Sequence, residues 1–205
     1  MEEKRYFVGV DLGERRDHTV IAVVERSVER ARGFDFVRLR RVEEGVLWRY
    51  RLRYLRRLGL GSGYEVAVEA VGRVVKGAEI QGGRYEVVVD ATGVGAGVVE
   101  MMKRAFGGVT AVVITGGSSA RIGEGRWLTP RKDLIGELAV MLEQRVLKVA
   151  AGLGELGQLE RELLGMRMGR GGREHDDAVM AVALACWRGR RRGMIGEQGR
   201  SLGLG

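Results

Sequence analysis

The stretch Tyr85-Glu-Val-Val-Val-Asp-Ala-Thr-Gly-Val-Gly-Ala-Gly-Val-Val-Glu100 decides the fold. Three consecutive valines form a short apolar run that is typical of a buried strand, and the run ends at the carboxylate of Asp90. The small residues 91–95 follow, and then an apolar pattern with helical spacing. A strand that carries an acidic residue at its carboxyl end and then turns into a helix is a common way for α/β proteins to build a site.

This stretch permits three interpretations. The turn could bind a phosphate on the N–H groups that open the helix. Asp90 could instead hold a metal ion, with the glycines allowing the chain to turn tightly beside it. The third interpretation is a structural turn in which the aspartate caps the helix. The choice depends on the other acidic residues of the chain.

Composition narrows the class of protein. The 205 residues suggest one domain, and 45% of them are hydrophobic, which is enough for a substantial core. Thirty-five Lys and Arg residues against 27 Asp and Glu residues give a net charge of +8, which favours a polyanionic partner, most simply nucleic acid. The single cysteine, Cys186, excludes a disulfide framework and fits a reducing, cytoplasmic setting. No apolar run is long enough to predict a membrane span, and the amino terminus does not resemble a signal peptide.

Outward from the central stretch, the hydrophobic pattern predicts an α/β fold with a mixed central sheet, in which three antiparallel strands precede parallel strands and helices flank the sheet. Strands are expected at residues 6–13, 18–25, 34–41, 85–90 and 109–115, while residues 46–58 fit either a strand or a helix. A helix is expected at residues 64–77 with Ser62 as its cap, and a second should follow the central strand and end at about residue 106. A third should start with Thr129 as its cap and Pro130 as its first residue, and two more are expected at residues 154–164 and 174–187. Gly-rich loops are expected at residues 116–126 and 166–172. Residues 1–187 would form the domain, and residues 188–205 a basic, Gly-rich, disordered tail.

Four acidic residues stand where predicted elements begin or end. Asp11 ends the first strand, Asp90 ends the central strand, and Asp176 and Asp177 open the last helix. Several carboxylates buried together need cations, and hard oxygen ligands suit Mg²⁺ or Mn²⁺. Two such ions could activate a water and stabilise the leaving oxygen of a phosphodiester. The structural alternative is that each acid serves a turn, or complements the dipole of the last helix.

Four segments, taken in order, resemble the nuclease domain of phage terminase large subunits. They are residues 8–19 (VGVDLGERRDHT), 87–95 (VVVDATGVG), 129–135 (TPRKDLI) and 175–185 (HDDAVMAVALA). The resemblance spans residues 5 to 187 and implies an RNase H-like fold. It also implies a two-metal endonuclease that cuts double-stranded viral DNA during packaging.

The resemblance carries its metal-binding and catalytic positions onto Asp11, Asp90 and the pair Asp176 and Asp177, with Asp177 favoured as the main ligand of that pair. Asp17 occupies a position that is often acidic in the family, so it is either a helper at the site or a structural residue. His175 neighbours the acidic pair and is a second candidate helper, or simply a polar residue at a helix start. Basic residues near the predicted site could contact DNA phosphates, or could simply be solvated: Arg121, Arg126, Arg131, Lys132, Arg167, Arg170 and Arg173.

The chain departs from the family in one large respect. Terminase large subunits carry an ATPase, and this sequence has no G-x-x-x-x-G-K-[ST] motif and no room for that domain. We therefore expect one of three arrangements: a nuclease domain cut out of a longer protein, a split terminase whose packaging ATPase is a separate chain acting with the portal in the host cytoplasm, or a stand-alone nuclease of the same fold. The initial methionine favours a natural stand-alone chain.

Three rival functions stay open at the level of sequence. A Holliday-junction resolvase would share the carboxylates and prefer branched DNA. An ATP-dependent kinase of the actin-like group also opens with a strand and Asp-x-Gly, although that fold needs two such halves. A non-catalytic DNA-binding remnant would bind DNA without cutting it.

Overall fold

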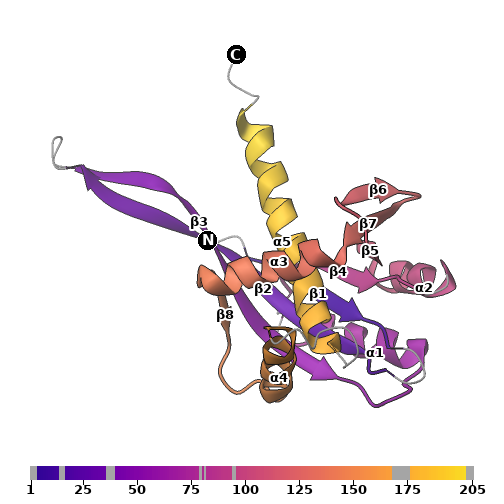
Figure 1. Cartoon of the computed structure of the whole chain (residues 1–205). Coiled ribbons are helices and arrows are strands. Elements are labelled where there is room, and N and C mark those ends of the chain that lie inside the picture. Colours follow the sequence, from indigo (N-terminus) through magenta and orange to yellow (C-terminus); the bar gives the residue numbers. More distant parts are fainter. Residues whose placement is uncertain are drawn as a thin grey trace.

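The computed structural model describes residues 4–13, 17–35, 40–78, 80, 82–93, 96–167 and 176–201, with the backbone alone for 30–35, 40–46, 96, 167 and 192–201. Strands come first in the chain, and helices alternate with strands later (Figure 1). The elements are β1 (Arg5–Asp11), β2 (Val20–Asp35), β3 (Arg40–Arg57), α1 (Tyr64–Lys76), β4 (Arg84–Asp90), α2 (Ala96–Phe106), β5 (Val109–Thr115), β6 (Arg121–Gly123), β7 (Arg126–Pro130), α3 (Arg131–Glu143), β8 (Leu147–Val149), α4 (Leu156–Arg167) and α5 (Asp177–Ser201).

The strands form one sheet in the order β6-β7-β5-β4-β1-β2-β3-β8. The first three strands are antiparallel neighbours, whereas β1, β4, β5 and β7 are successive parallel neighbours. At the two edges, β8 lies parallel to β3 and β6 lies antiparallel to β7. The prediction of an α/β protein with a mixed sheet flanked by helices is therefore confirmed.

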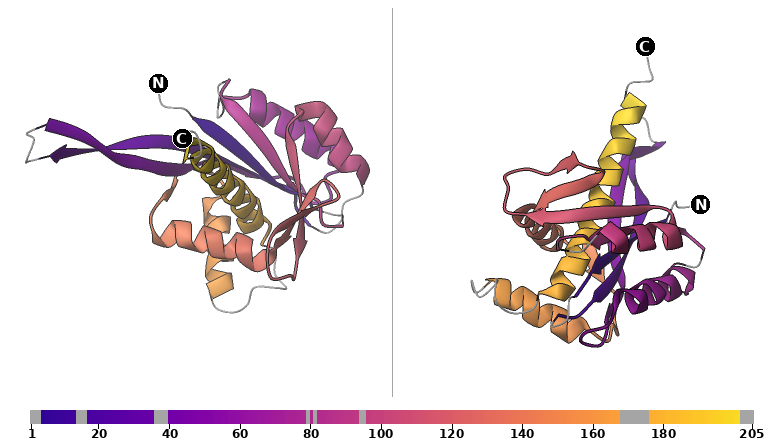
Figure 2. Two further views of the ribbon diagram at one scale, coloured as in Figure 1. Left: turned by 90° about the horizontal axis from the view of Figure 1, so that it is seen from above. Right: turned by 90° about the vertical axis from the view of Figure 1, so that its right-hand side faces the viewer.

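Helices cover both faces of the sheet and bury a separate apolar cluster on each face. Successive residues of a strand point to opposite faces, so Phe7 of β1 packs in the cluster with α3, α4 and α5, whereas Val8 packs in the cluster with α1 and α2. The two views of Figure 2 show the resulting three layers, with the sheet between the two groups of helices. Because β1 lies between β2 and β4, its apolar residues are shielded on both faces and both edges.

The helix α5 crosses β1 unusually closely. Ala181 and Ala185 are fully buried on the side of α5 that faces the sheet, and a Cβ added to Gly9 would lie 2.0 Å from the carbonyl oxygen of Ala181. Farther along the helix, a Cβ added to Gly189 would lie 3.3 Å from the ring of Phe7. Since later residues of α5 lie over earlier residues of β1, the helix runs antiparallel to the strand and begins near the strand's carboxyl end.

The first hairpin is longer than the hydrophobic pattern predicted. Strands β2 and β3 extend away from the rest of the sheet as a two-stranded arm (Figure 1). Phe34 pairs with Arg41 across this arm, so the prediction of a separate strand at residues 34–41 is wrong, and the ambiguous stretch 46–58 belongs to β3. Alternation indicates extended backbone, but it does not indicate which residues pair across an antiparallel hairpin.

Both predicted helix caps are wrong. The N-cap of α1 is Gly63, and the hydroxyl of Ser62 donates instead to the carbonyl of Gly59 at 2.6 Å. Thr129 and Pro130 end the strand β7, so that Pro130 is the N-cap of α3 and the side chain of Thr129 is buried beneath it. Capping preferences depend on residues next to each other in the chain. Here residues 127–130 pair with β5, so Thr129 lies in a strand and cannot cap the helix that follows.

Two other boundaries also differ from those expected. The predicted loop 116–126 contains the short strand β6. The last helix continues to Ser201 rather than ending at Trp187, so the predicted domain boundary between residues 187 and 188 falls inside α5. Arg188, just past that boundary, is buried and donates to Glu86 of β4 at 2.6 Å. Within the described ranges, none of the helices has the length and apolar character needed to cross a bilayer.

Candidate active site

Asp11 and Asp90 lie side by side at the carboxyl ends of β1 and β4. The parallel register pairs Val10 with Val89, so the two aspartates follow on neighbouring strands, which are about 4.8 Å apart. Alternation along each strand places both residues on the face covered by α5, the face to which Phe7 also contributes. The sheet therefore brings two carboxylates together on one face.

Asp177, the first residue of α5, completes a group of three carboxylates from three elements. Burial raises the pKa of Asp11 well above its ordinary range, and the negative charges of Asp90 and then Asp177 raise this pKa further. Such electrostatic effects require the carboxyl groups to lie close together. The three acids thus share one partly dehydrated region.

The turn after β4 holds Asp90 by hydrogen bonds. The backbone N–H of Thr92 donates to Oδ1 of Asp90 at 2.8 Å, and the Thr92 hydroxyl accepts from the N–H of Ile114 in β5 at 2.8 Å. Gly93 takes a φ of 70°, which explains the need for glycine there. Burial raises the pKa of Asp90, and the hydrogen bonds from Thr92 partly offset this rise. Val94 and Gly95, on which a phosphate-binding turn would depend, lie outside the described residues.

Glu162 of α4 is a buried acid beside this group that the sequence reasoning missed. Its side chain is 3% exposed, and its Oε2 accepts the backbone N–H groups of Ala178 and Val179 at 3.0 Å each. Its Oε1 accepts from Arg57 of β3 at 2.8 Å. A signal was present in the sequence, because Glu162 stands three residues after Leu159 on a helix side that is otherwise apolar.

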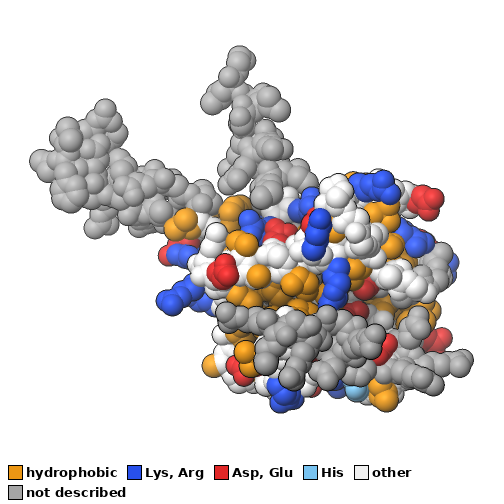
Figure 3. Space-filling view, viewed as in Figure 1, with side chains coloured by type: hydrophobic (Ala, Val, Ile, Leu, Met, Phe, Trp, Pro, Cys, Tyr) orange, Lys and Arg blue, Asp and Glu red, His pale blue; other side chains and the backbone are white. Residues whose placement is uncertain are grey.

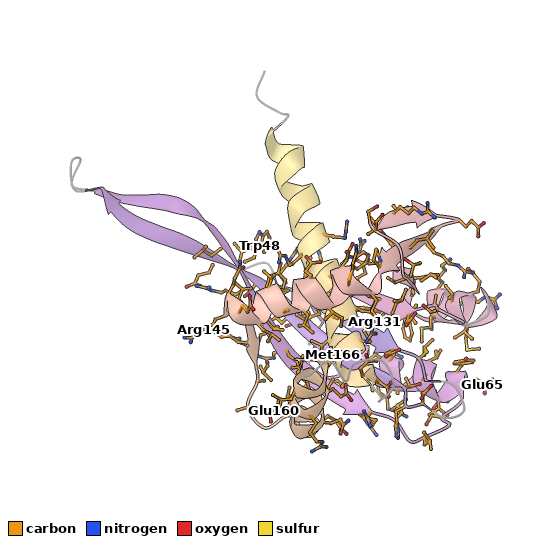
Figure 4. All side chains as sticks on the ribbon, in the orientation of Figure 1. Trp48, Glu65, Arg131, Arg145, Glu160 and Met166 are labelled. Atoms are coloured by element: carbon orange, nitrogen blue, oxygen red, sulfur yellow. The ribbon has the colours of Figure 1, made fainter. Side chains whose placement is uncertain are left out.

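Two arginines face the carboxylates from different sides. Arg57 ends β3, and its Nη2 lies 4.0 Å from Oδ2 of Asp177. Arg131, the first residue of α3, donates to Oδ2 of Asp176 and, at 3.0 Å, to the sulfur of Met180, so it lies over the first turns of α5 (Figure 4). Its positive charge offsets a small part of the rise that burial causes in the pKa of Asp11 and of Asp90. Asp176 is therefore engaged by Arg131, while Asp177 is the member of the pair whose charge acts on Asp11.

The remaining predicted site residues are dispersed. Asp17 is exposed in the connection between β1 and β2, Arg121 and Lys132 are exposed on β6 and α3, and Arg126 is half-buried on β7. The Lys and Arg side chains are spread over the face of Figure 3 and do not gather into a single patch there. Three predicted residues and one side chain lie outside the described part of the chain: Arg170, Arg173, His175 and the side chain of Arg167.

The donor set suits a hard divalent cation. Burial and then the charges of Asp90 and Asp177 raise the pKa of Asp11, and a nearby cation would offset that repulsion. Carboxylate oxygens are ligands that suit Mg²⁺ or Mn²⁺. Among the described residues, no group of three or more His, Cys, Asp or Glu side chains is arranged so that it could hold a metal ion. As they stand, the three carboxylates therefore do not enclose an ion, and their side chains would have to move for a metal to bind between them.

Comparisons of the whole chain with protein-family models, with curated proteins and with solved structures give no match.

Proposed function

We propose that this protein is a metal-dependent endonuclease with an RNase H-like fold that cuts double-stranded DNA in the manner of a terminase nuclease domain. The observation that carries the proposal is the meeting of Asp11, Asp90 and Asp177 on one face of the sheet, where burial and then charge repulsion raise the pKa of Asp11. The arrangement of antiparallel strands first and parallel strands later agrees with the fold that the terminase resemblance implies.

Each of the three carboxylates has a defined task in this proposal. Asp11 and Asp90 would hold a cation from the rigid ends of two paired strands, and Asp177 would approach it from the helix above them. Two Mg²⁺ or Mn²⁺ ions held there would supply a hydroxide nucleophile and would stabilise the leaving 3′ oxygen. Thr92 would keep Asp90 oriented through the turn, and Arg131 would keep Asp176 out of the ligand set.

The charge of the chain supports nucleic acid as the substrate. A net charge of +8 attracts a polyanion over long distances, and the contacts with phosphates make such binding depend on salt. In the terminase setting, the nuclease would act in the host cytoplasm together with a separate packaging ATPase and portal. The DNA would be held by basic residues outside the carboxylate group, of which Arg121, Arg126 and Lys132 are described candidates.

The test is DNA cleavage by the whole chain and by two matched variants. Supercoiled, linear and branched DNA are incubated with Mn²⁺, Mg²⁺ or EDTA, beside Asp90→Asn and beside Glu69→Gln, whose side chain is 72% exposed on α1. We expect cutting that needs the metal, that disappears in Asp90→Asn and that persists in Glu69→Gln. Cutting that survives EDTA or Asp90→Asn would refute the proposed site. Cutting confined to branched DNA would indicate a resolvase instead, and salt-dependent binding of DNA without cutting would indicate a non-catalytic protein.

A further inference from the structure

The start of α5 is capped by an acidic residue from another helix. A helix amino terminus presents backbone N–H groups that need acceptors, and an Asp at the first positions commonly provides one. Here the N–H groups of Ala178 and Val179 both donate to Oε2 of Glu162 on α4, at 3.0 Å each. Capping of α5 is therefore a long-range contact, and Asp177 does not have to perform it.

The second oxygen of Glu162 binds the nearest arginine. Nη2 of Arg57 lies 2.8 Å from Oε1 of Glu162 and 4.0 Å from Oδ2 of Asp177, so the guanidinium stands between two carboxylates and lies closer to Glu162. Gln158 also donates to the same Oε1, at 3.0 Å. Both oxygens of Glu162 are thus engaged by protein groups, which makes Glu162 a poor metal ligand although it lies beside the acids.

The sheet places this pair next to the carboxylate group. Antiparallel registers pair Asp11 with Val20 and Val20 with Arg57, so the three residues form one row across β1, β2 and β3. The side chain of Arg57 is only 18% exposed, and a guanidinium in such a position needs a carboxylate partner. Without the charge of Glu162, the carboxylate of Asp177, at 4.0 Å, would be the next partner for Arg57.

We infer that Glu162 is a positioning residue that keeps Asp177 for the cation, an inference that rests on the proposed metal-dependent function. Glu162 does so in two ways: it caps α5, which fixes where Asp177 begins the helix, and it neutralises Arg57, which would otherwise compete with a divalent ion for Asp177. Arg57 would thus compete with the metal ion for Asp177, and Glu162 prevents this by pairing with Arg57.

The test measures the affinity of the whole chain for Mn²⁺ alone by titration calorimetry. We expect Glu162→Gln to bind Mn²⁺ about tenfold more weakly, because Arg57 then pairs with Asp177. Removing the competitor in the double variant Glu162→Gln/Arg57→Gln should return the affinity to within about threefold of the wild type, and Arg57→Gln alone should bind at least as tightly as the wild type. The control is Glu160→Gln, an exposed acid on the same helix (Figure 4), which should not change the affinity.

The outcomes separate this inference from the proposed function. Wild-type affinity in Glu162→Gln would overturn the inference, and so would a double variant as weak as Glu162→Gln, since lost capping alone would then explain the effect. Should circular dichroism show Glu162→Gln to be unfolded, Arg57→Gln decides: a weaker affinity overturns the inference, and an equal or tighter one supports it. An Asp11→Asn variant tests the site itself, because Mn²⁺ binding that is absent in the wild type, or unchanged in Asp11→Asn, would overturn the proposed function and the inference together.

Discussion

Replacing Gly9 by alanine should destabilise the protein and disturb the candidate active site together. The new Cβ would lie 2.0 Å from the carbonyl oxygen of Ala181 and 3.0 Å from the backbone nitrogen of Ala185. An ordinary contact between carbon and oxygen is about 3.3 Å or longer, so α5 would have to retreat from β1 by roughly 1.3 Å. The obstructing atoms belong to a helix backbone, which cannot rotate away as a side chain can.

The magnitude follows from two opposing terms. Overpacking of a close-packed interface costs about 1–3 kcal/mol, and a clash with backbone on this scale belongs at the upper end of that range. Alanine also lowers the conformational entropy of the unfolded chain, which raises the free energy of unfolding by about 0.5–1 kcal/mol. We therefore expect Gly9→Ala to lower the free energy of unfolding by about 2 kcal/mol. Since Asp177 begins the displaced helix, Mn²⁺ affinity should fall as well.

Urea unfolding followed by circular dichroism measures the first effect, and calorimetric titration with Mn²⁺ measures the second. Gly136→Ala is the matched control, because Gly136 is exposed inside α3 and a Cβ added there meets no atom within 4 Å. The free energy of unfolding of Gly136→Ala should rise by about 0.5–1 kcal/mol, because alanine has a higher helix propensity than glycine. A Gly9→Ala protein that unfolds at the same urea concentration as the wild type, or at a higher one, would refute the close approach of α5 to β1.

Two further predictions concern the carboxylates and the turn. Burial and the charges of Asp90 and Asp177 raise the pKa of Asp11 above its ordinary 3.8. With EDTA present to remove metal ions, the free energy of unfolding of the wild type should therefore fall as pH rises from about 4 through that raised pKa. Asp11→Asn carries no charge and should therefore be more stable relative to the wild type at pH 8 than at pH 4, and urea midpoints that differ equally at both pH values would contradict this. Thr92→Val removes the acceptor of the Ile114 N–H and should lower the free energy of unfolding by about 1 kcal/mol, whereas Thr92→Ser keeps the oxygen and should lose less. Equal urea midpoints for these two variants would count against the hydrogen bond.

Local sequence predicted the central elements of the fold well. The valine run of β4 and the apolar strand β1 are short and buried, and each ends at an aspartate, so the hydrophobic pattern predicts where they lie and where they end. The hairpin of β2 and β3 could not be placed in the same way. Extended backbone leaves an alternating pattern, but the point of reversal depends on pairing between residues far apart in the chain, such as Val20 and Arg57.

The caps show the same limit at helix starts. Ser62 and Thr129 have the right chemistry for capping, yet each makes a different structural contribution, Ser62 in a turn and Thr129 within β7. The acceptor that does cap α5 is Glu162, which comes from another helix. Capping residues can be predicted only when the acceptor lies next to the helix in the chain.

The sequence by itself determined that Asp11 and Asp90 end strands and that an acidic pair opens the last helix, because hydrophobic patterns stop at these residues. Only the tertiary structure decided how these acids differ. It ties Asp176 to Arg131 and sets Asp177 beside Asp11. The physical reason is that burial, charge repulsion and capping at this site arise between elements that meet only after the sheet has formed and α5 has packed across it.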